Sequence, residues 1–364
     1  MSINTVSIRP VDLYDVLPLV CGDGLSAMVW GVPGVGKTMI VEDIARNRLG
    51  GGFFDCRLPG MDPSALRGLQ VPDLRERVTV ELLPDLLPRD GHGIIFLDEI
   101  TAARQDVQVQ AYGLILERRI GRYRVPDGFW IVAAGNGITD GAVHHEMGTA
   151  LSDRLVHFRV IPHLDSFLAW YARDPTAPTE IPAFLKIRPD LLSDVDRQLE
   201  RDDLIGPSPR SWARFAGILR RTRDRRLLRI VLAGLVGEAA AAEFFLVLDE
   251  IEGATAAGDI LAEPDRARRV AMLPRSVAGL YNLVFGLATL ATDAPTGIRA
   301  IEIVEDMDAL AGTGLPVGDL KVFAVETILG RLHAAGGMAL MHAVTTSPPY
   351  LRVREARTRF QAPG

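Results

Sequence analysis

Residues 31–38 carry side chains and glycines of the types that bind phosphate. They read Gly31-Val32-Pro33-Gly34-Val35-Gly36-Lys37-Thr38, between an apolar run at 26–30 and a helical pattern that opens at Met39. In such a loop, glycines let backbone N–H groups surround phosphate oxygens, a lysine reaches the β- and γ-phosphates, and a threonine hydroxyl binds Mg²⁺. We expect Gly31, Pro33, Gly34, Val35, Gly36, Lys37 and Thr38 to bind a nucleoside triphosphate; the alternative is an ordinary Gly-rich turn.

Two carboxylates, Asp98 and Glu99, follow a second apolar run at residues 93–97. Nucleotide hydrolysis requires a held metal ion and an oriented water molecule. We expect Asp98 to join Thr38 at the Mg²⁺ ion and Glu99 to act as the general base. The alternative is a solvated Asp-Glu pair at the end of a core strand.

A neutral amide follows a third apolar run. Residues 130–134 lead to Gly135 and Asn136, so the Asn136 amide could hydrogen-bond the γ-phosphate or the attacking water. Asn is also common after strands for purely local turn geometry. The pattern alone leaves both interpretations open.

Short β-rich runs alternate with helical segments in the first part of the chain, which predicts an α/β fold with a parallel sheet. Candidate strands are residues 27–30, 53–57, 93–98, 129–134 and 156–160, and Gly50-Gly51-Gly52 should end the helix that follows the phosphate loop. Helical runs then dominate, including 210–221, 226–248 and 277–290. We expect an α/β nucleotide-binding domain at 1–162, a helical domain at 163–255 and a helical C-terminal region at 256–364 in which no motif stands out.

The composition is that of an ordinary globular protein. Of 364 residues, 24% are charged, and the formal net charge of −6 provides no overall field that favours nucleic acid. Cys21 and Cys56 lack metal-ligand spacing, and the N-terminus lacks the pattern of a secretory signal, so we expect a cytoplasmic protein. The most apolar long stretch, 227–248, is interrupted by three charged residues, so we expect no membrane span.

The order of these motifs resembles that of the AAA+ ATPases, over roughly residues 5–250. After the Asn136 strand come Ala150-Leu151-Ser152-Asp153-Arg154-Leu155 and then Pro207-Ser208-Pro209-Arg210. The chain is most similar to the MoxR group, although it has Ile100-Thr101-Ala102-Ala103, Gly137 and Asp153-Arg154-Leu155 where that group commonly has Asn-Arg-Ala, Pro and Asp-Arg-Phe. The resemblance implies a three-layer P-loop core, a helical lid domain, and ATP and Mg²⁺ as ligands.

The resemblance also implies roles for particular residues. Asn136 corresponds to the first sensor, Arg154 to an arginine finger that reaches a neighbouring subunit's γ-phosphate, and Arg210 to the second sensor. A finger supplied by a neighbour requires a homo-oligomeric head-to-tail ring, which is a hexamer in the family. Alternatively, Arg154 pairs with Asp153 or Glu146, and Arg210 is a solvated residue at a helix start.

Two segments of the first domain are expected to form β-hairpins. Residues 60–88 contain an alternating run at 75–81, in the place of an insert that projects toward the central pore in MoxR-like rings, and residues 118–128 alternate around Gly121. The alternative is a pair of surface ribbons without a partner.

The resemblance implies a protein client, in the family often one with a von Willebrand A domain, and remodelling or activation of that client. A cluster of arginines supports a second hypothesis, a nucleic-acid motor or loader. Its members are Arg214, Arg220, Arg221, Arg223, Arg225, Arg226 and Arg229. We favour a solvated or subunit-contacting face, with Glu200, Asp202, Asp203 and Asp224 as nearby acidic residues, because no aromatic residues are interleaved.

Two further interpretations are weighed. A small-molecule phosphotransferase would also have a phosphate loop, but it would be a monomer with an acceptor pocket. His144-His145-Glu146 lacks the second histidine of a His-Glu-x-x-His zinc motif, so we assign no zinc site.

Overall fold

The computed structural model of the chain describes residues 5–137, 152–195, 198 and 203–361. The chain divides into two units. The first comprises Met1–Phe167, Ser193–Leu204 and Ser208–Arg210, and the second comprises Leu168–Leu192, Ile205–Pro207 and Ser211–Gly364. Each unit is described by itself.

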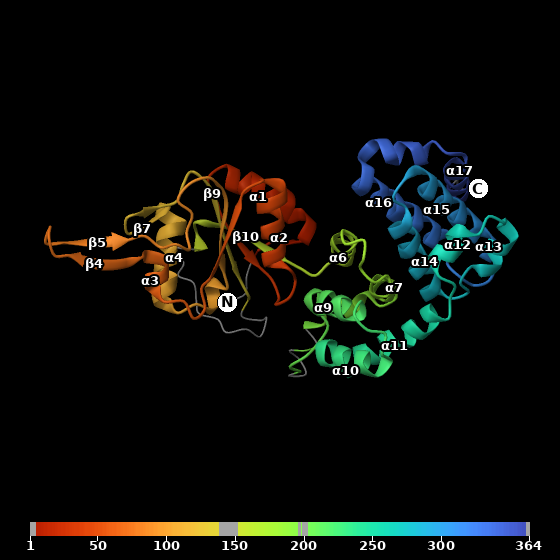
Figure 1. The fold of residues 1–364 in the computed structure, drawn as a ribbon, viewed down its shortest axis with the longest axis horizontal. Coiled ribbons are helices and arrows are strands. Elements are labelled where there is room, and N and C mark those ends of the chain that lie inside the picture. Colours follow the sequence, from red (N-terminus) through yellow and green to blue (C-terminus); the bar gives the residue numbers. More distant parts are fainter. Residues whose placement is uncertain (1–4, 138–151, 196–197, 199–202, 362–364) are drawn as a thin grey trace. The chain divides into compact units, whose positions relative to one another are not determined.

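A six-stranded sheet forms the centre of the first unit, and every neighbouring pair of its strands is parallel. Across the sheet the strands run β1 (Ser7–Ile8), β10 (Leu155–Val160), β2 (Ser26–Trp30), β9 (Gly128–Gly135), β6 (His92–Asp98) and β3 (Gly52–Arg57). Figure 1 labels β9 and β10 of this sheet. The predicted parallel sheet and its five candidate strands are confirmed. The two-residue edge strand β1 is too short to give a periodic signal and was not expected.

Helices cover both faces of this sheet, which gives the expected three layers. Buried residues of α1 (Leu13–Gly22) and α2 (Lys37–Asp43) pack with Ala27 and Val29 of β2 on one face. Those of α3 (Pro63–Arg67) and α4 (Gln105–Glu117) share a core with Met28 and Trp30 on the other. Because both faces are covered, the central strands are apolar almost throughout.

The helix after the phosphate loop ends where the sequence predicted. A short π-helical turn, Ile44–Arg48, continues α2, and β3 starts at Gly52. Gly50 lies between them with φ +64°, a left-handed conformation that glycine adopts without strain.

Both predicted hairpins are present. The strands β4 (Leu69–Asp73) and β5 (Val78–Leu82) pair antiparallel, as do β7 (Arg119–Ile120) and β8 (Tyr123–Arg124). The carboxylate of Glu81 joins them by accepting the backbone N–H of Arg122 at 2.9 Å. Gly121, in the turn between β7 and β8, has φ +56°, a left-handed conformation that glycine adopts without strain.

Beyond β10 the described chain is helical. The helices up to residue 252 are α6 (Leu164–Tyr171), α7 (Glu180–Ile187), α9 (Pro209–Leu219), α10 (Arg225–Val236) and α11 (Glu238–Glu252). The prediction of one continuous helix over 226–248 is wrong, because Gly237 at φ +85° separates α10 from α11. An aromatic cluster holds α7, α9 and α11 together: the rings of Phe184, Trp212 and Phe244 lie 5.3–5.9 Å apart.

The C-terminal region is also helical, as predicted. Its helices are α12 (Ala257–Ala262), α13 (Arg266–Met272), α14 (Val277–Leu290), α15 (Ala294–Asp306), α16 (Val317–Thr345) and α17 (Pro348–Gln361). The predicted helix at 277–290 coincides with α14. Within α16, Gly337 has φ +63° and interrupts the helical backbone.

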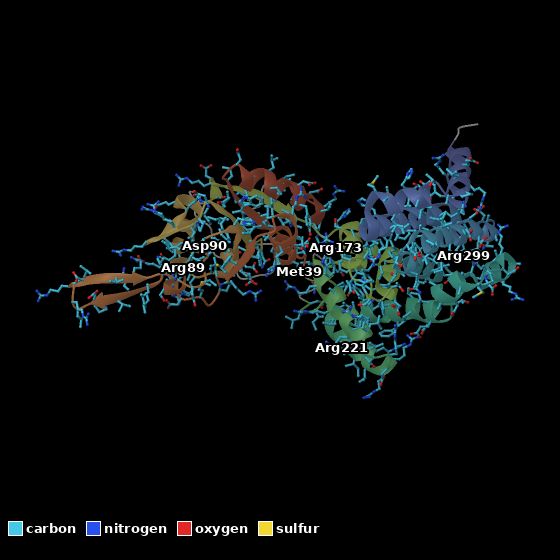
Figure 2. The ribbon with its side chains drawn as sticks, turned by 45° about the horizontal axis from the view of Figure 1, so that its top comes forward. Met39, Arg89, Asp90, Arg173, Arg221 and Arg299 are labelled. Atoms are coloured by element: carbon cyan, nitrogen blue, oxygen red, sulfur yellow. The ribbon has the colours of Figure 1, made fainter. Side chains whose placement is uncertain are left out.

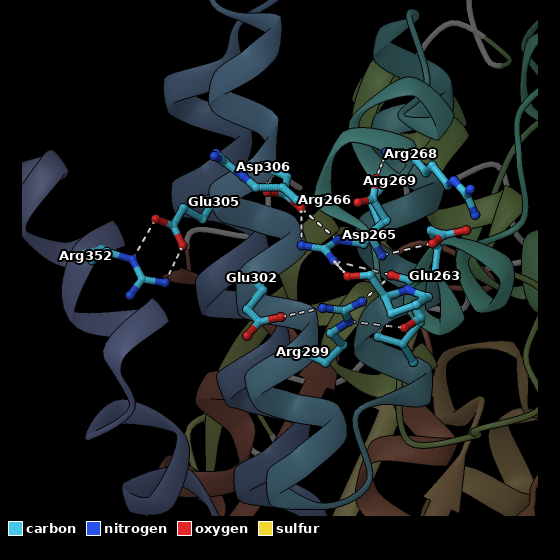
Figure 3. Close-up of polar contacts among 12 residues, drawn as sticks. Glu263, Asp265, Arg266, Arg268, Arg269, Arg299, Glu302, Glu305, Asp306 and Arg352 are labelled. Atoms are coloured by element: carbon cyan, nitrogen blue, oxygen red, sulfur yellow. Dashed lines mark hydrogen bonds and ion pairs between the residues drawn. The ribbon is translucent and has the colours of Figure 1, made fainter.

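A buried ion-pair network fastens α13 to α15 (Figure 3). Asp306 has a side chain only 3% exposed, and its two oxygens accept from Arg266 at 2.8 Å and from Arg269 at 2.9 Å. Arg269 also donates to the carbonyl oxygen of Pro264 at 3.0 Å, so this buried guanidinium is well paired. None of the helices that the structure describes is long and apolar enough to cross a membrane.

Candidate nucleotide-binding site

The phosphate loop joins β2 to α2 at the carboxyl edge of the sheet, where its backbone adopts a shape that requires glycine. Gly34 has φ +84° and Gly36 has φ +103°, a region that other residues adopt only with strain. A Cβ on Gly31 would lie 2.7 Å from the carbonyl oxygen of Val160. Since α2 begins at Lys37, its first N–H groups lack acceptors within the helix and suit phosphate oxygens.

The strand before the loop and the helix after it are placed as a phosphate site needs them. β2 lies between β10 and β9 in the middle of the sheet, and ligands of open α/β sheets bind where neighbouring connections diverge. Met39, in the first turn of α2, is 49% exposed (Figure 2). Within the loop itself Pro33 is exposed, whereas Gly31, Val32, Gly34 and Val35 are buried.

The ammonium group of Lys37 lies among oxygen atoms from two strands. Its Nζ donates to the carbonyl oxygen of Gly31 at 2.6 Å and to Asn136 Oδ1 at 2.8 Å. The first sensor candidate thus touches the phosphate-loop lysine directly, although 99 residues separate them in sequence. A γ-phosphate that accepts from Lys37 would lie within reach of the Asn136 amide.

Asn136 is held by Thr101, which lies in the short helical turn Ile100–Ala102 after β6. The buried hydroxyl of Thr101 accepts the Asn136 backbone N–H at 3.3 Å and donates to the Asn136 carbonyl oxygen at 3.4 Å. This pairing restrains the Asn136 backbone. The Asn136 side chain takes no part in it and accepts from Lys37 instead. The interpretation of Asn136 as a mere turn residue does not require this contact with Lys37.

The metal-side candidates also lie together. Thr38 Oγ1 donates to Asp98 Oδ2 at 3.1 Å, and the other Asp98 oxygen accepts the Glu99 backbone N–H at 2.9 Å. Asp98 is 3% exposed. A hydroxyl and a carboxylate are oxygen ligands of the kind that Mg²⁺ prefers beside phosphate, so this pair fits that ion.

Glu99 has an unusual backbone. Its φ of +54° and ψ of +38° are left-handed, which is rare for a residue other than glycine. Such strain is concentrated at functional sites, where the surrounding structure imposes it. The Glu99 side chain is half-buried, so it retains access to a water molecule at this edge.

Two further charged residues of β3, Asp55 and Arg57, lie near Asp98 and were not among the site residues predicted from the sequence. Partial burial and the neighbouring Asp98 carboxylate raise the pKa of Asp55. Arg57 pairs with Asp98 in the strand register, and its Nη2 lies 3.9 Å from Asp98 Oδ2. The signal that could have found Arg57 is its position at the end of β3, because Asp98 ends the neighbouring strand β6.

The two arginine candidates lie in different settings. The segment of Arg210 lies against the phosphate loop: its backbone N–H donates to the Gly34 carbonyl oxygen at 3.2 Å, and its Cβ would be 3.3 Å from a Cβ on Gly34. Arg154 is exposed in the turn before β10 and makes no hydrogen bond or ion pair with any described residue, Asp153 included. Glu146, its other suggested partner, lies outside the described residues, as do His144 and His145.

Several arginines of the helical cluster are engaged within the chain. Arg220 pairs with Asp174 at 2.6 Å, and Arg223 pairs with Glu180 at 2.7 Å. Arg225 pairs with Glu252 at 2.9 Å. Helix packing brings these acidic partners from distant segments, and none of them was named as a partner from the sequence. Two of the expected partners, Glu200 and Asp202, lie outside the described residues. Their pairing leaves fewer charges for nucleic-acid phosphates.

Comparison with known protein families gives one match, over the part of the chain that contains the phosphate loop. The family model "ATPase family associated with various cellular activities (AAA)" matches residues 27–138. No match is found among curated proteins.

Solved structures with a similar fold include a protein of Cytophaga hutchinsonii assigned as an ATPase, with 11% identity and a TM-score of 0.33 over 87% of this chain and 88% of that one. A RuvB mutant of Thermotoga maritima has 17% identity and a TM-score of 0.36 over 75% and 83% of the two chains. NtrX of Brucella abortus has 16% identity and a TM-score of 0.33 over 89% and 69%. At these values the likenesses carry no inference about activity. The family match and the six-stranded parallel sheet together identify residues 27–138 as an AAA ATPase family domain.

Proposed function

We propose that the chain is an AAA+ ATPase of MoxR type that couples Mg²⁺-dependent ATP hydrolysis to remodelling or activation of a partner protein. The observation that carries the proposal is a pair of hydrogen bonds at the carboxyl edge of the sheet. Lys37 Nζ donates to Asn136 Oδ1 at 2.8 Å, and Thr38 Oγ1 donates to Asp98 Oδ2 at 3.1 Å. A Gly-rich turn without a ligand would not require these contacts.

Each residue has a distinct task in this proposal. Lys37 donates to the β- and γ-phosphates, and Thr38 and Asp98 supply oxygen atoms to Mg²⁺. A Mg²⁺ ion held there would neutralise phosphate charge. Glu99 orients the attacking water and accepts its proton, while the Asn136 amide hydrogen-bonds the water or the γ-phosphate.

The two arginines complete the site. We assign Arg154 as the finger that reaches the ATP of the next protomer in a homo-oligomeric ring, and its exposure supports this role. Arg210 acts as the second sensor, supported by the contact of its backbone with Gly34. We retain the division into a nucleotide-binding domain (1–162), a helical lid (163–255) and a C-terminal region (256–364) as part of the proposal.

The client is a protein in this proposal, and the two hairpins joined by Glu81 transmit motion to it. The family resemblance makes a von Willebrand A domain the first candidate for the client. Intrachain pairing of the arginine cluster weighs against the nucleic-acid hypothesis. Stimulation of ATPase activity by DNA or RNA, with a steep salt dependence of binding, would favour that hypothesis instead.

Replacement of Glu99 tests the ATPase assignment. Glu99→Gln should retain ATP binding and lower kcat by at least about 100-fold, because a positioned general base contributes on the order of 10²–10⁴-fold. The matched control is Glu117→Gln, which changes an exposed glutamate that pairs only with Arg119 on the surface and should keep wild-type turnover. Turnover of the Glu99 variant equal to the control would refute the role.

A further inference from the structure

His157 of β10 connects the strand before the phosphate loop to the turn that carries Arg154. Trp30, the last residue of β2, donates its indole N–H to His157 Nδ1 at 2.9 Å. The other ring nitrogen, Nε2, lies 2.8 Å from the carbonyl oxygen of Ser152 and 3.3 Å from its hydroxyl. One side chain therefore contacts two segments that lie more than a hundred residues apart in sequence.

These contacts select the hydrogen-bond roles of the two ring nitrogens. An indole N–H can only donate, so Nδ1 accepts from Trp30. The ring hydrogen on Nε2 then donates to the Ser152 carbonyl oxygen. The Trp30 and His157 rings are also nearly parallel, with 14° between their planes, so packing and hydrogen bonds select the same orientation.

The arrangement restrains the turn of Arg154 from both sides. Ser152 lies two residues before Arg154, and Leu155, directly after it, pairs with Ser26 of β2. Trp30 is 5% exposed and immediately precedes Gly31 of the phosphate loop. His157 thus links the turn of the exposed Arg154 to the end of the buried strand that precedes the phosphate loop.

We propose that His157 is a positioning residue for the arginine finger: its hydrogen bonds with Trp30 and Ser152 hold Arg154 where it can reach the ATP of the neighbouring protomer. The inference rests on the proposed function, in which Arg154 acts on the next subunit. A histidine that only filled the face of the sheet would need neither hydrogen bond, and an apolar residue of similar size would serve equally well.

Two substitutions separate hydrogen bonding from packing. His157→Leu keeps apolar bulk and removes both hydrogen bonds. We expect kcat to fall about tenfold, the effect of losing two hydrogen bonds worth about threefold each, with KM for ATP unchanged within about twofold. His157→Gln has an N–H donor at a similar reach and should recover part of the loss. Trp30→Phe, which removes only the indole donor, should have the smaller effect of about threefold.

Mixed rings show whether the effect passes to the neighbouring subunit. His157→Leu subunits are combined with Glu99→Gln subunits, which cannot hydrolyse ATP but present a correctly held Arg154. We expect turnover per intact Glu99 to rise toward the wild-type value, because the neighbour now supplies the finger. Arg154→Ala combined with Glu99→Gln is the matched control and should recover in the same way.

The outcomes distinguish the two proposals. If Arg154→Ala is inactive while all three variants of His157 and Trp30 keep wild-type kcat, the role of His157 is refuted and the finger stands. A loss in the His157 variants that mixing does not restore also refutes it, because the effect then lies within the subunit's own phosphate loop. Full turnover by Arg154→Ala overturns the proposed finger itself. Thermal unfolding of each variant identifies any that fails to fold, and the Gln and Phe variants then carry the test.

Discussion

The contact between Lys37 and Asn136 allows a quantitative test of the nucleotide site. Asn136→Asp replaces a neutral amide by a carboxylate of the same size, 2.8 Å from the Lys37 ammonium. Two unit charges at that distance attract with about 6 kcal/mol at an effective dielectric constant of ~20 and about 1.5 kcal/mol at ~80. The half-buried Lys37 lies between these limits.

The introduced carboxylate competes with ATP in two ways. It holds Lys37 away from the phosphates, and it repels the phosphate charge directly. Because each 1.4 kcal/mol changes a dissociation constant about tenfold, we expect ATP binding to weaken by at least about tenfold. At saturating ATP, the stabilisation that the nucleotide confers should fall by about 1.4 kcal/mol for each tenfold loss.

Calorimetric titration with Mg-ATP measures the affinity, and thermal unfolding with and without ATP measures the stabilisation. The matched control is Asn136→Ala, which removes the hydrogen bond from the Lys37 ammonium, worth about 1.5–3 kcal/mol as a bond to a charged group, and adds no charge. Lys37 then keeps the Gly31 carbonyl oxygen as its partner. Equal ATP affinity of the Asp and Ala variants would mean that Lys37 and Asn136 are not neighbours, and the reasoning from the site geometry would fail.

Two further predictions concern buried groups. Asp306→Asn leaves the guanidinium of Arg269, whose side chain is 6% exposed, without its charged partner, and should lower the free energy of unfolding by about 3–5 kcal/mol in urea titrations; a change below about 1 kcal/mol would contradict the network. Burial raises the pKa of both Cys21 and Cys56 to about 12. Since the thiolate is the reactive form, both should resist iodoacetamide at pH 8 in the folded protein and react once it is unfolded in urea; fast labelling without urea would show that these thiols are accessible.

Features of the fold that depend on nearby residues were predictable from the sequence. The phosphate loop, the strands that end at Trp30 and Asp98, and the turn around Gly121 are each specified by consecutive residues. Their apolar runs and glycines restrict the backbone wherever the segment is placed. The prediction of one helix over 226–248 was wrong. Apolar periodicity continues through Gly237, but the positive φ of this glycine ends the helix there.

Contacts between distant segments were not predictable. The pairing of Thr101 with Asn136 and of His157 with Trp30 and Ser152 depends on which strands are neighbours, and the periodicity of a strand does not encode its neighbours. The order β10-β2-β9 places the phosphate loop between the strands that lead from Arg154 and to Asn136.

The sequence by itself thus determined the chemical groups of the site and the local backbone that presents them. The tertiary structure decided which of those groups touch, because hydrogen bonds and ion pairs act over a few ångströms while partners such as Trp30 and His157 lie 127 residues apart along the chain.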